Sequence, residues 1–217
     1  MMLFRFEGIT YTLGLRQERK ISVSGSLNEG FALIVRGPSG AGKSTLLRVL
    51  AKLQTCLAGE AYLEEKSWQE IPVTTWRSKV HYLSQKPALF DGTVAENLAR
   101  PFGILAGTKK QFDPNLAARL MKELLLPSDL WDQDARTLSG GEAARLAFIR
   151  SLLIDPMVLL LDEPTASLDE KSRCAFYEVL SRWLAQPSKA ALLISHNNDF
   201  RELSQLAYLD IDSNPRR

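Results

Sequence analysis

The feature that most constrains this chain is a glycine-rich stretch, GPSGAGKST, at residues 37–45. Gly37, Gly42, Lys43 and Ser44 occupy every fixed position of the pattern G-x-x-x-x-G-K-[ST], and an apolar run precedes it while an amphipathic segment follows it. The glycines let successive N–H groups turn toward the β- and γ-phosphates of a nucleotide, Lys43 adds positive charge, and Ser44 offers a hydroxyl to Mg²⁺. The sequence therefore predicts a strand, loop and helix that bind nucleotide through Gly37, Pro38, Ser39, Gly40, Ala41, Gly42, Lys43, Ser44 and Thr45.

Length and composition place the chain among ordinary globular proteins. Its 217 residues favour one large domain, and 45% hydrophobic with 24% charged residues excludes disordered and integral membrane classes. A net charge of +2 gives no electrostatic reason to expect direct nucleic-acid binding. Cys56 and Cys174 are far apart, so we expect two free thiols in a reducing compartment. The first residues lack a signal-peptide pattern, which leads us to expect a cytosolic chain.

The remaining pattern predicts strands alternating with helices, an α/β organisation. Apolar runs and period-two alternation predict strands near 3–6, 21–24, 59–71, 80–84, 158–161 and 191–195. Asp113 and Pro114 form an N-cap and first-turn pair inside a helical region between 91 and 138. An amphipathic helix is predicted between the last two strands.

A pair of carboxylates follows the apolar run 158–161. Asp162 and Glu163 are predicted to emerge at the carboxyl end of a buried strand, where open α/β sheets bind their ligands. Asp162 is then placed to hold Mg²⁺ and Glu163 to orient or deprotonate the attacking water. The alternative is that the two acids cap a helix and add charge to its first turn. Their place in the same predicted sheet as the phosphate loop favours the binding role over this alternative.

The sequence LSGGE at 138–142 has the pattern of a helix start. Ser139 and Glu142 are spaced as a capping box. A plain helix start would explain this spacing, but Gly140 and Gly141 also strip side chains from the helix N-terminus and leave N–H groups bare for an anion.

With these motifs in view, the chain resembles the ATP-binding cassette (ABC) ATPases over essentially all its length. The family's signature LSGGQ is matched as LSGGE, and the motifs occur in family order: the phosphate loop, LSQ at 83–85, LSGGE, LLLDE at 159–163, SLD at 167–169 and His196. The resemblance implies a P-loop NTPase core of ABC ATPase type, with an N-terminal antiparallel β subdomain and an inserted helical subdomain. The implied lobes of the single domain 1–217 are a nucleotide-binding core at 1–85 and 143–217 and a helical subdomain at 86–142.

The same resemblance implies roles for further residues. Gln85 is similar to the family's loop glutamine that senses Mg²⁺ and the γ-phosphate, and His196 to its switch histidine. Asp169 matches the loop that crosses the dimer interface; otherwise it would be a helix N-cap. Tyr11 is the best candidate for stacking on adenine, although Phe6 is near and a tyrosine packed within the sheet is the alternative.

Family membership would also imply partners. The signature residues Ser139, Gly140 and Gly141 of one subunit would close over ATP and Mg²⁺ held by the other, in a homodimer with two ATP molecules. We expect an ATPase subunit that works with a separate integral membrane permease on the cytoplasmic face of the inner membrane. The alternatives are an ABC ATPase that regulates a membrane complex without transport and one that acts on nucleic acid or translation.

Two finer expectations concern the permease and the cargo. The stretch SQKPALFDGTVAENL resembles compact bacterial ATPase subunits, including some assigned to metal or iron export, but the cargo itself is not readable from this chain. A surface that receives the permease is expected at Leu89, Phe90, Val94 and Leu98, with plain core packing as the alternative.

Overall fold

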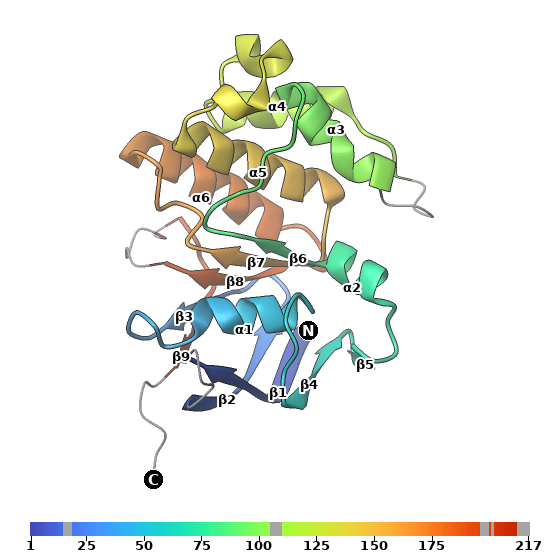
Figure 1. Ribbon diagram of the computed structural model, residues 1–217, viewed down its shortest axis with the longest axis vertical. Coiled ribbons are helices and arrows are strands. Elements are labelled where there is room, and N and C mark those ends of the chain that lie inside the picture. The colour runs from blue at the N-terminus through green and yellow to red at the C-terminus, as the bar shows by residue number, and fades with distance from the viewer. Residues whose placement is uncertain (15–18, 105–109, 196–199, 201, 212–217) are drawn as a thin grey trace.

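A computed structural model describes residues 1–14, 19–104, 110–195, 200 and 202–211. Figure 1 shows them stacked in layers, with an antiparallel sheet at the bottom, one helix above it, a parallel sheet next, and two layers of helices on top. This arrangement confirms the α/β fold expected from the sequence, with an antiparallel sheet near the N-terminus and helices inserted later.

The parallel sheet is the centre of the molecule. Its strand order is β6-β7-β8-β3-β9, formed by β6 (Val80–Leu83), β7 (Val158–Asp162), β8 (Ala190–Ile194), β3 (Ala32–Arg36) and β9 (Leu206–Asp210). Along β7, Leu159 and Leu161 pack into one core while Val158 and Leu160 pack into the other. Because both faces are covered, this strand reads as a continuous apolar run instead of an alternation.

The antiparallel sheet has the strand order β2-β1-β4-β5. It is formed by β1 (Met2–Leu13), β2 (Arg19–Asn28), β4 (Ala58–Leu63) and β5 (Lys66–Ser67). The expectation of one strand over 59–71 was wrong. Glu64 and Glu65 have positive φ angles of 49° and 62°, so the chain reverses there into a short hairpin.

Helix α1 (Lys43–Leu50) lies between the two sheets and contacts both. Leu46, Leu47 and Leu50 are at most 1% exposed, so the helix is buried on more than one side. A short helix, α2 (Val73–Lys79), leads into β6 and buries Trp76, whose indole donates to the carbonyl of Leu50 at 2.8 Å. These contacts anchor the end of α1 away from the phosphate loop.

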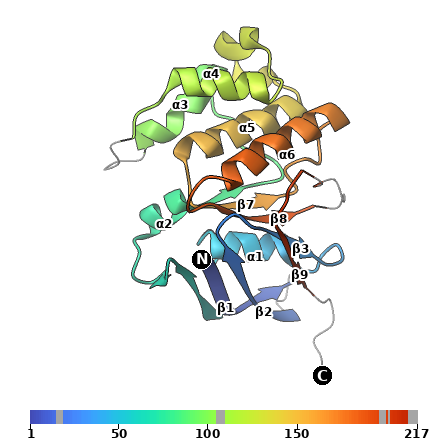
Figure 2. The same ribbon diagram turned by 180° about the vertical axis from the view of Figure 1, so that it is seen from behind.

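The other face of the parallel sheet carries the helical lobe, as Figure 2 shows from behind. It contains α3 (Val94–Ile104), α4 (Pro114–Glu123), two 3₁₀ turns η1 (Ser128–Asp132) and η2 (Ala135–Thr137), α5 (Gly140–Ile154) and α6 (Glu170–Leu184). The predicted cap of α4 is confirmed, since the Asp113 carboxylate accepts from the N–H groups of Asn115 and Leu116. The expected lobe boundary between residues 142 and 143 falls inside α5, which is one uninterrupted helix.

Two smaller expectations can be placed against the structure. Cys56 and Cys174 are free cysteines, as expected. Among the described residues, no helix combines the length and the apolar character needed to cross a lipid bilayer.

Candidate nucleotide site

The phosphate loop joins β3 to α1, and glycine backbone holds its shape. Gly37, Gly40 and Gly42 have φ angles of 145°, 74° and 96°. A Cβ atom on Gly37 would lie 2.6 Å from the backbone oxygen of Ile211, so a side chain does not fit there. Gly42 is the N-cap of α1, and no side chain caps this helix. The N–H groups at the start of α1, with the positive end of the helix dipole, therefore face the loop without a side-chain acceptor.

Lys43 is folded into this loop. Its side chain is 8% exposed, and its Nζ donates to the carbonyl oxygens of Gly37 at 2.8 Å and Pro38 at 3.0 Å. Both acceptors are neutral, whereas a phosphate oxygen would accept a stronger, charge-assisted hydrogen bond. The lysine thus sits within the cradle, with an ammonium group that an anionic ligand can attract.

Asp162 and Ser44 meet at the end of β7. Asp162 is 3% exposed, and its Oδ1 accepts from the hydroxyl of Ser44 at 2.8 Å. A carboxylate and a hydroxyl held together are hard oxygen donors, the kind that Mg²⁺ takes beside nucleotide phosphates. This donor set fits the metal expected from the sequence.

The structure adds two residues that sequence reasoning missed. Tyr82, on the neighbouring strand β6, donates its hydroxyl to Oδ2 of Asp162 at 2.8 Å and accepts from Nε of Arg48 on α1 at 3.3 Å. Burial raises the pKa of Tyr82 to about 12, which keeps its phenol protonated and able to donate. Both oxygens of the Asp162 carboxylate are therefore held, one by Ser44 and one by Tyr82.

Gln85 and Glu163 are also brought together. The Gln85 amide Nε2 donates to Oε2 of Glu163 at 2.7 Å. Glu163 follows directly after β7 in a left-handed conformation, with φ at 48°, and its backbone N–H donates to the carbonyl of Ile194 at the end of β8. A left-handed backbone conformation is unfavourable for a glutamate and persists only where surrounding contacts stabilise it. The fold therefore determines the direction of this side chain.

The helix start predicted at LSGGE is confirmed as a capping box. The Ser139 hydroxyl accepts from the Glu142 N–H at 3.3 Å, while a Glu142 oxygen accepts from the Ser139 N–H at 2.8 Å. The Ser139 hydroxyl also donates to Glu142, and this hydrogen bond lowers the pKa of the Glu142 carboxyl. The box therefore orders the first turn of α5.

The two glycines of this helix start differ in what surrounds them. A Cβ on Gly141 would lie 3.0 Å from the carbonyl oxygen of Ser167, so packing inside the chain favours glycine there. Among the described residues, a Cβ on Gly140 would meet only Ser167 Cβ, at an ordinary 3.9 Å, and Gly140 is exposed without a positive φ. Neither steric contact nor backbone conformation within the chain requires a glycine at position 140.

Asp169 caps α6, as the sequence alternative held. Its carboxylate accepts from the Ser172 N–H at 2.7 Å, and this bond lowers the pKa of Asp169. The preceding loop touches the signature, because the Ser167 hydroxyl donates to the Gly140 carbonyl at 3.3 Å. The signature and the SLD loop thus form one surface of the chain.

Tyr11 does not fit the adenine-stacking role expected for it. Its ring is 1% exposed, and its hydroxyl donates to the Gly42 carbonyl at 3.1 Å. Phe6, the other candidate, is fully buried. A base cannot stack on a ring enclosed between a sheet and a helix, so Tyr11 is the sheet-packed tyrosine of the alternative. Leu13 lies further along β1 and is half-buried beside Gly42.

The four residues expected to receive the permease differ in burial. Val94 and Leu98 are at most 1% exposed and belong to the core. Leu89 and Phe90 are half-buried, and the guanidinium groups of Arg100 and Arg150 lie 4.3 and 5.1 Å from the centre of the Phe90 ring. His196, expected to contact the γ-phosphate, lies outside the described residues.

These groups gather on one side of the molecule. Figure 1 shows the phosphate loop before α1 and the carboxyl ends of β7 and β8 on its left side, below the start of α5. The phosphate loop joins the parallel sheet to α1, whereas the signature begins α5 in the helical lobe. The candidate residues therefore form two groups on different layers of the fold.

Two of the curated proteins similar to this chain are named as ATP-binding proteins of an export and an import system. The probable iron export ATP-binding protein FetA of Escherichia coli K12 is 33% identical over 199 residues, which cover 91% of this chain and 86% of FetA. The maltose/maltodextrin import ATP-binding protein MalK of Escherichia coli K12 is 35% identical over 79% of this chain and 45% of MalK. Protein STAR1 of rice is 38% identical over 89% of this chain and 55% of STAR1.

A solved structure and a family profile agree with the curated relatives. The ATP-binding cassette MJ0796, solved as a dimer in a post-hydrolysis state with ADP and Pi, superposes with a TM-score of 0.81 at 25% identity, covering 96% of each chain. The profile of the family described as ABC transporter matches residues 21–166, about two thirds of the length. With the phosphate loop, the carboxylate pair and the signature all in place, the chain belongs to the ABC transporter family of ATP-binding proteins.

Proposed function

We propose that this chain is the ATP-hydrolysing subunit of a transporter whose membrane permease is a separate chain. The names of FetA and MalK describe ATP-binding proteins of export and import systems, which supports the class of activity. The subunit would then lie on the cytoplasmic face of the inner membrane, attached through the permease. Co-expression with the permease should move the chain into the membrane fraction, and its failure to do so with every candidate permease would contradict this part of the proposal.

The described residues divide the work on ATP between them. The loop 37–45 would hold the phosphates, with Lys43 on the terminal ones, and Ser44 with Asp162 would hold Mg²⁺. Bound Mg²⁺ would neutralise charge that develops on the phosphate oxygens. Glu163 would orient and deprotonate the attacking water, and Gln85, which bonds to Glu163, would hold that carboxylate in position.

The observation that carries the proposal is the exposed glycine at the start of α5. Gly140 is exposed and sterically unnecessary within its own chain, yet it removes a side chain from a capped helix N-terminus. A glycine of this kind makes sense where backbone N–H groups must approach something outside the chain. We propose that Ser139, Gly140 and Gly141 close over ATP bound by a second copy, and that Asp169 lies at the same interface. The resulting homodimer would hold two ATP molecules.

The test is Gly140→Asp, which sets a carboxylate against the phosphates of the partner's nucleotide. ATP binding to the monomer should persist because the phosphate loop is untouched, whereas ATP-dependent dimerisation and hydrolysis should fall at least tenfold. Gly103→Asp is the matched control, because Gly103 is an exposed helical glycine whose Cβ would meet nothing within 4 Å. Equal hydrolysis and dimerisation in Gly140→Asp and wild type would reduce the signature to a helix cap.

A further inference from the structure

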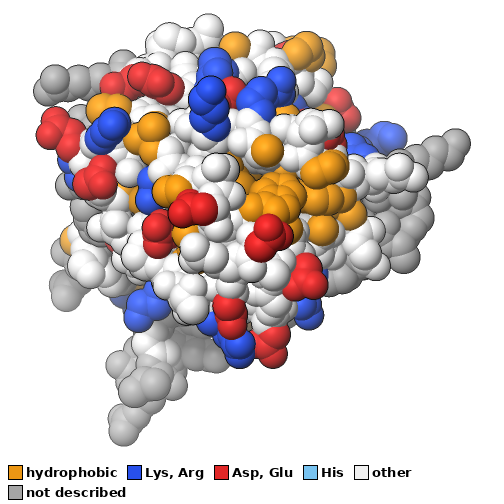
Figure 3. Space-filling view, turned by 90° about the horizontal axis from the view of Figure 1, so that it is seen from above, with side chains coloured by type: hydrophobic (Ala, Val, Ile, Leu, Met, Phe, Trp, Pro, Cys, Tyr) orange, Lys and Arg blue, Asp and Glu red, His pale blue; other side chains and the backbone are white. Residues whose placement is uncertain are grey.

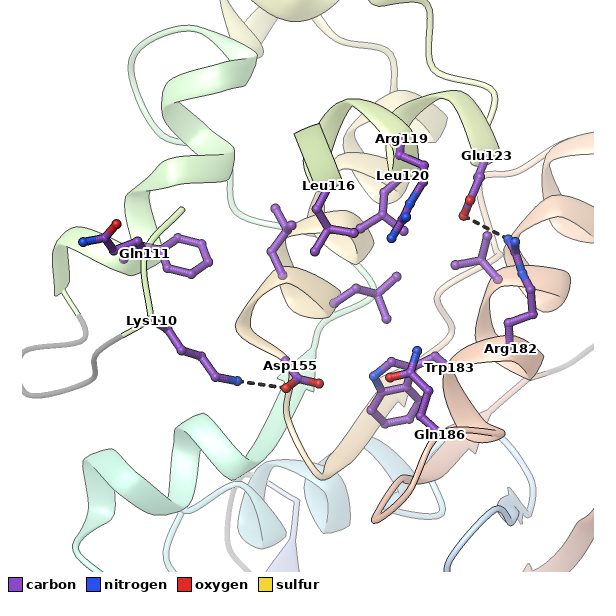
Figure 4. A pocket seen from close by; sticks show the side chains of 14 residues that line it. Lys110, Gln111, Leu116, Arg119, Leu120, Glu123, Asp155, Arg182, Trp183 and Gln186 are labelled. Atoms are coloured by element: carbon purple, nitrogen blue, oxygen red, sulfur yellow. Dashed lines mark hydrogen bonds and ion pairs between the residues drawn. The ribbon is translucent and has the colours of Figure 1, made fainter. Parts of the chain in front are cut away.

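A cavity of about 640 Å³ lies in the helical lobe, away from the nucleotide groups. It opens between α4 and α6, with the last residues of α5 as its base. Figure 4 shows its side chains converging from these helices and from the segment at Lys110. Leu120, Leu153 and Val179 give the cavity an apolar floor. A volume of this size lies within the range of sites for small molecules.

An unsatisfied donor is built into the wall of this cavity. Trp183 is 5% exposed, and its indole Nε1 is buried without a hydrogen-bond partner among the described residues. In Figure 4 the indole lies at the lower end of the cavity, with the exposed side chain of Gln186 beside it. An unpaired buried donor destabilises the fold, and an acceptor that reached it from a ligand would relieve this cost.

Among the residues that line the opening, one cation has no carboxylate partner. At one end Asp155 pairs with Lys110 at 2.9 Å and also with the buried Lys189, and at the other end Arg182 pairs with Glu123 at 2.9 Å. Arg119, on α4 between them, has no ion pair or hydrogen bond within the described part of the chain. Figure 4 shows its side chain on the cavity side of α4. The cavity therefore combines an apolar floor with one unpaired positive charge and one unpaired N–H.

We propose that this cavity binds a small amphipathic monoanion, a carboxylate with an unbranched apolar body. The apolar body would cover the floor, Arg119 would pair with the carboxylate, and Trp183 would donate to one of its oxygens. Arg182 is paired with Glu123, and Lys110 and Lys189 share Asp155, so Arg119 is the cation at the cavity whose charge is free for the ligand. This site shares no residue with the phosphate loop, the carboxylate pair or the signature.

Decanoate is the test probe, used below its micelle concentration, and decanol and decylammonium are the matched neutral and cationic probes. The full chain labelled with ¹⁵N gives one indole signal for each of its four tryptophans, and Trp183→Phe identifies the signal of interest. Decanoate should shift the Trp183 signal saturably, and Arg119→Gln should weaken binding at least tenfold. Lys122→Gln is the matched control, since Lys122 is an exposed cation on the same helix that lines a different cavity.

That second cavity, of about 760 Å³, makes the outcome specific. It lies on α4 and η1 where Met121, Leu126 and Trp131 line it, and Figure 3 shows hydrophobic side chains gathered on this upper side of the lobe. A saturable shift of the Trp183 signal that depends on Arg119 supports the proposal. A shift of the Trp131 signal alone, equal binding of decanol or decylammonium, or no saturable binding below 1 mM (roughly −4 kcal/mol) overturns it.

Discussion

The hydroxyl of Tyr82 should set the affinity of the site for Mg²⁺. Asp162 is 3% exposed, and its two oxygens are held by Ser44 and Tyr82, each at 2.8 Å. Tyr82→Phe removes one of these two bonds and leaves Oδ2 without that donor in a buried place. A hydrogen bond to a charged acceptor contributes about 1.5–3 kcal/mol, and loss of such a supporting contact lowers metal affinity by roughly 10- to 100-fold. We therefore expect the Mg²⁺ concentration that half-saturates hydrolysis to rise by about that factor.

Two assays separate this effect from general damage. Hydrolysis is titrated with Mg²⁺ at saturating ATP, and Mn²⁺ binding with a non-hydrolysable ATP analogue is followed by electron paramagnetic resonance. Tyr62→Phe is the matched control, because the Tyr62 hydroxyl bonds to Glu60 in the outer sheet. ATP binding without metal should be unchanged in both variants. If Tyr82→Phe leaves both metal titrations within twofold of wild type, the hydroxyl does not position Asp162 for the metal.

Three further predictions concern Lys43 in the phosphate loop, Glu163 after β7 and His81 on β6. Lys43→Ala removes the buried ammonium in the phosphate loop, so ATP affinity measured by equilibrium dialysis should fall by about 10- to 150-fold with turnover, and normal hydrolysis would disprove the assignment. Glu163→Gln keeps the shape but cannot accept a proton, so turnover should fall by roughly 10²- to 10⁴-fold while ATP and Mg²⁺ hold a dimer visible by size-exclusion chromatography; an active variant would remove Glu163 from its role. Burial lowers the pKa of His81 to about 4, against roughly 6.5 in an unfolded chain, so the folded state binds fewer protons between these values. The neutral ring therefore contributes its full stabilisation above about pH 6.5, and this is lost as the pH falls toward 4. The shift sets an upper limit of about 3 kcal/mol, and the partial exposure of the ring lowers the true loss below that limit. The free energy of unfolding in urea should fall less between pH 7 and pH 4.5 for His81→Gln than for wild type. Equal falls in the two proteins would refute this.

Local sequence patterns were sufficient to predict the features that residues close together in the sequence form. The phosphate loop needs glycines at fixed spacing, and the capping box at Ser139 and the N-caps at Asp113 and Asp169 involve residues two or three positions apart. The buried strand before Asp162 was readable for the same reason, because a run of apolar side chains covered on both faces needs no alternation. These features follow from backbone geometry over a few residues.

Tertiary structure decided which side chains meet. Period-two alternation in β1 shows that Tyr11 and its alternating neighbours share a face, but only the packing of α1 against that face encloses the ring and removes it from adenine. Tyr82 lies 80 residues from Asp162, and their contact depends on β6 pairing with β7 in parallel register. Val94 and Leu98 were expected at a surface that receives the permease, but they belong to the core because α3 packs against α5. Short-range rules specify the elements of this protein, whereas burial and side-chain contacts depend on distant segments whose packing no local pattern encodes.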